Sequence, residues 1–250
     1  MEISFVVFPF IIGLVFGSFF NVVGLRVPKN ESIVAPPSHC SKCKRRLTSL
    51  DLIPVVSYLC LRGKCRTCGM KISPLYLWIE LLTGMLYAMA TYKIGFTPEL
   101  AVVLLFISLL IIIVVSDIVY MIIPDKILLF FLPFLILGRI LEPLDPWWDS
   151  VLGAMIGFGM LYFIAVMSKG GVGGGDIKLL FLIGLVLGWM NTILTLFLAS
   201  VIGLLTGIIV LKIRGEGKKT PFPFGPAIAI SAIFVYFYGE KIIYWYIGNL

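Results

Sequence analysis

The sequence predicts an all-α polytopic membrane protein with about eight transmembrane helices and a small cytosolic zinc-binding insert between the first and second helices. Of its 250 residues, 60% are hydrophobic and only 13% are charged, and the mean hydropathy is +1.08. This composition excludes an ordinary soluble domain. Apolar runs close to the ~20 residues that cross a bilayer recur along the chain. Four cysteines in two close pairs lie between the first two runs.

Each apolar run is expected to be a helix, because backbone polar groups in lipid must be satisfied within their own segment. The sixth predicted span is short, and its boundary with the seventh is expected at residues 188–191. The predicted spans cover residues 3–25, 75–92, 99–116, 124–141, 148–167, 177–189, 191–211 and 227–247.

The basic residues predict the orientation of these spans. If residues 26–74 are cytosolic and eight spans alternate, all of the 20 basic residues except Lys93, Arg139 and Lys241 lie on the cytosolic side, Lys218 and Lys219 among them. This positive-inside bias favours both termini outside. The net charge of +7 is therefore interpreted as a topology signal, and no nucleic-acid partner is expected.

The first apolar run is expected to be retained as a membrane helix. It lacks the basic N-terminal region of a signal peptide, and Arg26 follows the run instead of preceding it. Gly13, Gly17 and Gly24 give this helix a small-residue face that favours close helix packing. Asn21 is expected either to form a hydrogen bond between helices or to line a substrate path.

The insert carries two Cys-x-x-Cys pairs, Cys40 with Cys43 and Cys65 with Cys68, and 21 residues separate the pairs. Each pair offers two sulfurs to one tetrahedral ion, so the spacing predicts a structural zinc site. A disulfide is disfavoured on the cytosolic side, and thiol redox chemistry and simple packing remain the alternatives. Cys60 stands outside the pattern and is expected to be a buried apolar residue.

Two aspartates interrupt the apolar sequence. Asp117 ends the run that begins at Leu104, and Asp176 follows three glycines and opens the run at Ile177. Ionisable groups at membrane depth are costly and usually functional. A pair of carboxylates can activate a water, one holding a proton while the other acts as base. The assigned topology puts both on the cytosolic side, in different loops.

Other chemistries fit the sequence less well. His39 is the only histidine, which excludes an HExxH metalloprotease and disfavours a Ser-His-Asp triad. The glycines of residues 170–175 lack the Gly-Lys-Ser/Thr ending of a phosphate-binding loop. They are interpreted as allowing close backbone approach, with a flexible turn and a helix-capping Asp176 as the alternative. Asp125 follows Pro124 and is interpreted as an anion at a helix start.

These features occur in an ordered series that resembles the type IV prepilin peptidases, bifunctional leader peptidases and N-methyltransferases of pilus, type II secretion and competence systems. The series contains Phe16-Gly17-Ser18-Phe19-Phe20-Asn21, the paired cysteines, Ile53-Pro54-Val55-Val56-Ser57-Tyr58, Glu80, Asp117, Ile123-Pro124-Asp125, Gly173-Gly174-Gly175-Asp176 and Pro223-Phe224-Gly225-Pro226. The resemblance implies that Asp117 and Asp176 are catalytic, the latter in a Gly-x-Gly-Asp motif. Residues 1–26 are then the first transmembrane helix, 27–74 the tetracysteine insert and 75–250 the helical aspartic peptidase domain.

The resemblance also implies the reaction. A prepilin or pseudopilin is cut after glycine at the cytosolic face of the bacterial inner membrane, and S-adenosylmethionine then methylates the new N-terminal amine. The methyltransferase activity is expected from the resemblance alone, since the sequence indicates no soluble nucleotide-binding fold. The alternatives are a membrane ion or metal transporter that uses intramembrane carboxylates, or a zinc-stabilised membrane scaffold.

Overall fold

The computed structural model describes residues 4–214 and 223–248, and the described chain is helical with only isolated β-bridges outside its helices. Lys218 and Lys219, which the sequence assigns to the cytosolic side, lie outside the described residues. Long helices occupy all eight of the predicted ranges: α1 Ser4–Arg26, α3 Pro74–Ile94, α4 Pro98–Tyr120, α5 Asp125–Leu141, α6 Asp149–Met167, α7 Gly174–Leu187, α8 Trp189–Arg214 and α9 Gly225–Gly248.

Within residues 4–214 and 223–248, five segments are long and apolar enough to cross a membrane. A multi-pass membrane protein is therefore supported, but the count of eight spans is not confirmed. The five segments are Phe5–Lys29, Pro98–Tyr120, Asp149–Met167, Trp189–Ile209 and Gly225–Tyr246. Helices α5 and α7 have only 17 and 14 residues. At 1.5 Å per residue they are about 25 and 21 Å long, short of a hydrocarbon core of about 30 Å. Helix α3 has 21 residues but falls short in apolar content.

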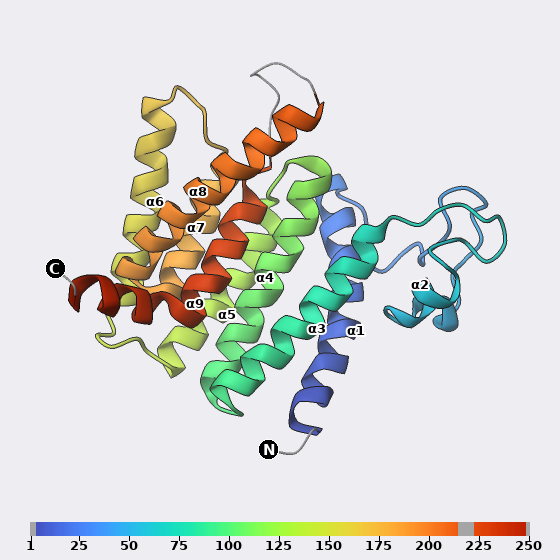
Figure 1. The fold of residues 1–250 in the computed structure, drawn as a ribbon, viewed down its shortest axis with the longest axis horizontal. Helices are drawn as coiled ribbons and strands as arrows, with labels where there is room; N and C mark the ends of the chain where they lie inside the picture. Colours follow the sequence, from blue (N-terminus) through green and yellow to red (C-terminus); the bar gives the residue numbers. More distant parts are fainter. Residues whose placement is uncertain (1–3, 215–222, 249–250) are drawn as a thin grey trace. The chain divides into compact units, whose positions relative to one another are not determined.

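The chain divides into two compact units, an N-terminal unit Met1–Val115 and a C-terminal unit Ser116–Leu250. In the N-terminal unit, α1 and α3 lie side by side (Figure 1). A Cβ at Gly13 would come within 2.8 Å of Gly84, and one at Gly17 within 2.9 Å of the Glu80 Cα. The predicted close packing of the small-residue face is therefore confirmed at these two glycines.

The insert between α1 and α3 contains short helical turns: η1 Val27–Lys29, η2 Ser49–Leu52 and α2 Val56–Cys60. The prediction that Cys60 is buried is wrong, because its side chain is exposed on α2. An apolar residue in a short run does not reveal from sequence alone which face of a helix it will occupy.

In the C-terminal unit, α7 packs closely on α6, and α8 packs on α9. Gly153 of α6 faces Gly184 of α7, so the two backbones approach without intervening side chains. The helix is interrupted between α7 and α8 at Gly188, which has φ +79°, a left-handed conformation that favours glycine. Asp149 accepts a hydrogen bond from the Trp189 amide at 3.0 Å, at the start of α8. The predicted boundary near 188–191 is confirmed.

Candidate active site

Asp117 lies in the last turn of α4, so the prediction that it lies in a loop is wrong. The helix ends at Tyr120, and the Ser116 hydroxyl donates to the Ile122 carbonyl at 2.6 Å, which stabilises the turn that follows. The Asp117 side chain is buried, and its Oδ2 accepts a hydrogen bond from the Gly225 amide at 2.8 Å. A Cβ at position 225 would lie 2.8 Å from the same oxygen, so only glycine allows this approach without a shift.

Asp176 lies in the first turn of α7, also a helix end instead of a loop. Its carboxylate is hydrogen-bonded to the backbone of Gly173. A Cβ at Gly173 would lie 2.9 Å from Asp176 Oδ2, and one at Gly175 would lie 2.6 Å from the Ile123 Cβ, whereas Gly174 has no atom within 4 Å of such a Cβ. Two of the three glycines thus bring backbone close to the carboxylate or to the segment before α5.

The two carboxylates come from distant parts of the C-terminal unit, yet they are near enough for the charge of Asp117 to act on Asp176. Two carboxylates at such proximity repel each other when both are ionised, which favours a state that shares one proton. Each of the two is held beside the backbone of a glycine. This arrangement can supply one proton donor and one base to a single reacting group.

Gly225 is a residue of this candidate site that the sequence did not single out. The motif Pro223-Phe224-Gly225-Pro226 contributed to the resemblance, but its contact with Asp117 joins residues 108 positions apart. Phe224 and Pro223 precede the start of α9 at Gly225. A glycine directly before Pro226 at a predicted helix start was the available signal.

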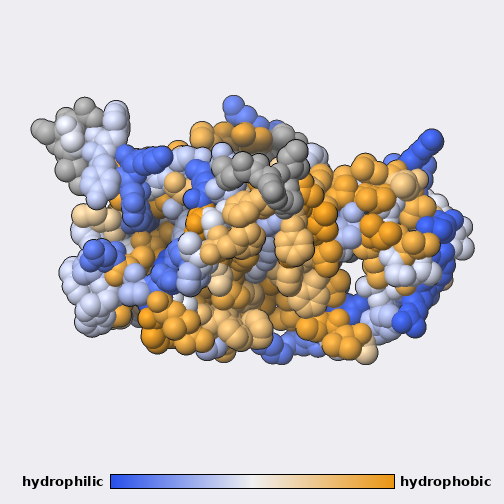
Figure 2. All heavy atoms as spheres, turned by 90° about the horizontal axis from the view of Figure 1, so that it is seen from below, coloured by the Kyte–Doolittle hydropathy of each residue, from blue (hydrophilic) through white to orange (hydrophobic). Residues whose placement is uncertain are grey.

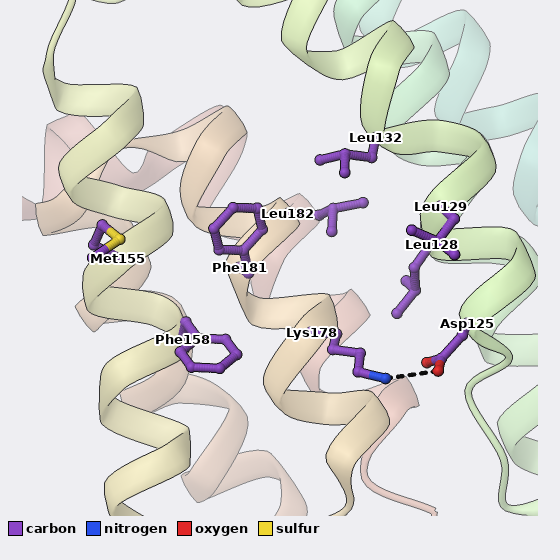
Figure 3. A pocket seen from close by; sticks show the side chains of 9 residues that line it. All are labelled: Asp125, Leu128, Leu129, Leu132, Met155, Phe158, Lys178, Phe181 and Leu182. Atoms are coloured by element: carbon purple, nitrogen blue, oxygen red, sulfur yellow. Dashed lines mark hydrogen bonds and ion pairs between the residues drawn. The ribbon is translucent and has the colours of Figure 1, made fainter.

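Asp125 does not belong to the carboxylate pair. It begins α5, as expected, and its Oδ2 accepts from Lys178 Nζ at 2.6 Å (Figure 3). Both side chains are about half exposed. The ion pair lies at one end of a cavity of about 490 Å³ between α5, α6 and α7 that is otherwise apolar. An exposed ion pair of this kind is worth only about 0–1 kcal/mol.

The four predicted cysteine ligands form one cluster in the N-terminal unit. Their sulfur atoms all lie within 4.8 Å of one another, with 3.7 Å from Cys40 to Cys68 and 4.0 Å from Cys43 to Cys65. Four sulfurs at about 2.3 Å from a tetrahedral zinc ion would be about 3.8 Å apart, so the donor set and its spacing fit zinc. Backbone hydrogen bonds from Cys43 and Lys42 lower the pKa of Cys40 to about 6, whereas desolvation and the neighbouring thiols raise the pKa of Cys43 to about 11, as expected when several thiols compete for negative charge in one site.

The two cysteine pairs occur on matching turns. The Cys40 amide donates to the Arg45 carbonyl at 2.9 Å, and the Cys65 amide donates to the Met70 carbonyl at 2.8 Å. Asp51 connects these turns: it pairs with Arg45, and with Arg66 Nε at 3.0 Å. The Thr48 amide and hydroxyl, together with both arginines, lower the pKa of Asp51 below its usual range. His39, beside Cys40, is exposed, as expected.

Two buried polar side chains, Asn21 and Glu80, form hydrogen bonds where α1 and α3 pack together. Asn21 is buried, and its Nδ2 donates to the Tyr76 carbonyl at 3.3 Å, so the expected hydrogen bond between helices is present. Glu80 is buried as well, and its Oε2 accepts from the Val55 amide at 2.7 Å. Val55 has φ +63°, an unusual conformation for a β-branched residue, and this hydrogen bond helps to hold it.

The chain is similar to proteins of known families along most of its length. The bacterial peptidase A24 N-terminal domain matches residues 11–94, and the type IV leader peptidase family matches residues 104–208. Proteins named prepilin leader peptidase/N-methyltransferase are 47% identical in Bacillus subtilis, over 95% of this chain and 96% of the relative, and 33% identical in Pseudomonas putida, over 95% and 92%. A Pseudomonas aeruginosa protein of the same name is 32% identical, over 98% and 94%. No solved structure matches the chain.

Proposed function

The chain belongs to the type IV leader peptidase family, and from this we propose that it removes the leader of type IV prepilins or pseudopilins and then N-methylates the new N-terminal residue. S-adenosylmethionine is the methyl donor in this proposal. The relatives carry both activities in their names, and they give no support to the transporter alternative.

Asp117 and Asp176 are the proposed catalytic pair. The observation that carries the proposal is that two carboxylates 59 positions apart in an apolar chain interact at the ends of two helices, each beside a glycine backbone. In the reaction, the ionised carboxylate takes a proton from water while the protonated one donates to the carbonyl of the scissile peptide bond. The Gly225 amide fixes one oxygen of Asp117, and therefore its orientation toward the water.

The substrate chemistry is consistent with this position. A prepilin has a short basic leader followed by an apolar helix, so its scissile bond lies where lipid meets cytosol. We propose that the helix ends carrying Asp117 and Asp176 lie at this cytosolic face, in the inner membrane, as the distribution of basic residues favours. A glycine before the scissile bond permits the extended backbone that the pair requires.

The tetracysteine cluster is proposed to hold a structural zinc ion. Such an ion would cross-link the two turns of an insert that has few buried apolar side chains, and its binding and the folding of the insert would be one equilibrium. Cys40, Cys43, Cys65 and Cys68 would be its ligands. No step of the peptidase reaction involves this metal.

Cleavage of a purified prepilin by near-isosteric variants tests the proposal. Asp117→Asn and Asp176→Asn should each abolish cleavage about as completely as the double change, because the pair acts as a unit. Asp125→Asn is the matched control: it removes an exposed ion pair at a helix start and should cost at most about 1 kcal/mol of stability, with cleavage retained.

Methylation gives an independent check that the two catalytic variants are folded. A substrate that is already cut should still be methylated by Asp117→Asn and Asp176→Asn if methylation uses another site. Substantial cleavage by Asp176→Asn at a matched concentration of folded protein would show that the carboxylates are structural.

A further inference from the structure

The insert contains an apolar surface that the peptidase proposal does not use. In α2, Val56, Leu59 and Cys60 have the i, i+3, i+4 spacing of one helix face, and all three are exposed, with Val56 at 53% and Leu59 at 61%. The opposite face is attached to the insert, because the Tyr58 hydroxyl donates to the Ile72 carbonyl at 3.3 Å. Leu50 and Leu52 in η2, which packs on α2, and Ile53 directly after η2 are exposed as well. We call these six residues the α2 surface.

The start of α2 is fixed beside the membrane helices instead of beyond their ends. Glu80 accepts from the Val55 amide and is also hydrogen-bonded to the Ser18 side chain. Ser18 lies eight residues before Arg26, the last residue of α1, which corresponds to about 12 Å along the helix. The headgroup layer of a bilayer is about 5–8 Å thick on each side. Because α1 is a candidate membrane span, the α2 surface begins at or below the depth of the headgroups.

The figures agree with this placement. In Figure 1, α2 lies to the side of α1 and α3, at the height of these helices. In Figure 2, the insert at the right shows hydrophobic spheres beside the hydrophilic ones that cover much of its outer edge.

The net positive charge of the insert also favours contact with the lipid bilayer. Residues 27–74 contain nine basic and two acidic residues, and one of the acidic residues, Asp51, is paired with two arginines. Arg62 and Lys64 follow α2 directly and are exposed. Basic side chains near a bilayer are attracted to anionic headgroups. An apolar helix face flanked by basic residues is the pattern of an element that lies in the membrane interface.

We propose that the insert is a peripheral membrane module: the α2 surface lies in the interfacial layer of the bilayer, and the surrounding basic residues contact anionic phospholipid headgroups. The insert would then be held at the membrane surface by lipid as well as by Glu80. This inference depends on the chain spanning a membrane and not on the peptidase chemistry.

A fluorescent probe on Cys60 tests the proposal in the full chain. The protein is reconstituted in nanodiscs that contain anionic phospholipid, and Cys60 is labelled with an environment-sensitive dye, with Cys60→Ser as the measure of background labelling. Nitroxide on the upper acyl chain of the lipid should quench the Cys60 probe at least about threefold more than it quenches a control probe, as expected for a helix face buried about 5–10 Å into the boundary between headgroups and acyl chains. The control is Arg46→Cys in the Cys60→Ser background, an exposed position near the first cysteine pair.

Iodide in the aqueous phase should give the opposite order of quenching. Quenching of the Cys60 probe by iodide as strong as that of the control would show that α2 faces water. Quenching by neither agent would show that another protein surface, such as a substrate or the rest of the chain, covers α2. Either result would overturn the proposal.

Discussion

The three glycines before Asp176 should differ sharply in their tolerance of alanine. In Gly173→Ala, the new Cβ would lie 2.9 Å from Asp176 Oδ2, about 0.5 Å inside the 3.4 Å at which ordinary contact begins. In Gly175→Ala it would lie 2.6 Å from the Ile123 Cβ, about 0.8 Å too close. Gly174→Ala meets nothing within 4 Å.

Each of these overlaps is expected to lower the cleavage rate by displacing the Asp176 carboxylate. A displacement of about 1 Å in an active site can cost about 100-fold. A shift of 0.5 Å therefore predicts a loss of about tenfold in kcat/KM for Gly173→Ala. Gly175→Ala should lose about 40-fold if the 0.8 Å by which Ile123 and the start of α7 must separate is passed on to Asp176, and it should also cost about 1–3 kcal/mol of stability. Gly174→Ala should change the rate less than about twofold and stabilise the protein by up to about 1 kcal/mol, because the unfolded chain loses conformational entropy.

The assay is cleavage of a purified prepilin by each variant in detergent, with rates divided by the concentration of folded protein. Thermal unfolding of the same samples separates the stability effect from the rate effect. Equal losses for Gly173→Ala and Gly174→Ala would refute the reasoning, because the motif would then not depend on the approach of backbone to carboxylate. Full activity in Gly175→Ala would refute it as well.

Three further predictions concern the insert and the topology. Cys68→Ser should lower the zinc content from about one ion per chain, measured by elemental analysis, and wild-type protein purified without metal depletion but lacking zinc would contradict the site. The pKa of Asp51 is lowered in the folded protein, so its carboxylate stabilises the insert fully above the ordinary pKa of about 3.9 and loses this effect as pH falls through the folded value. Asp51→Asn should therefore release zinc to a chelator faster than wild type. The factor should be the same at pH 7 and pH 5, because both lie above that range. Unchanged release would show that Asp51 does not support the insert. Cysteine-labelling probes at Lys44 and Asp145 should report opposite sides of the membrane, and an external signal at Lys44 would reverse the proposed orientation.

Most of the helices could be predicted from sequence because lipid and helix packing both demand long apolar runs. The number of spans could not, since a buried helix inside the protein is as apolar as one that crosses the bilayer. Helix α7 illustrates this: Leu179, Leu180 and Ile183 are fully buried, yet the helix is only 14 residues long. Apolar content alone therefore cannot distinguish its surroundings.

The cysteine cluster was predictable because its information is local. Each Cys-x-x-Cys pair forms its own turn, and 21 intervening residues suffice to bring the turns together. The contribution of Asp51 was not predictable, because its partners Arg45 and Arg66 are found only once the turns are in place. The prediction that Cys60 is buried failed for a similar reason, because the orientation of α2 depends on contacts of Val55 and Tyr58 with other parts of the unit.

The two aspartates also differ in whether their neighbours can be predicted from the local sequence. Asp176 has its glycine neighbours in its own sequence, so the motif that precedes it is visible without a structure. Asp117 receives an equivalent neighbour, Gly225, from the start of α9, and no local pattern around Asp117 indicates it. In both cases the missing Cβ allows a backbone amide to reach a carboxylate. If that contact positions the carboxylate, Gly225→Ala should impair cleavage as Gly173→Ala does, although the two glycines are 52 residues apart.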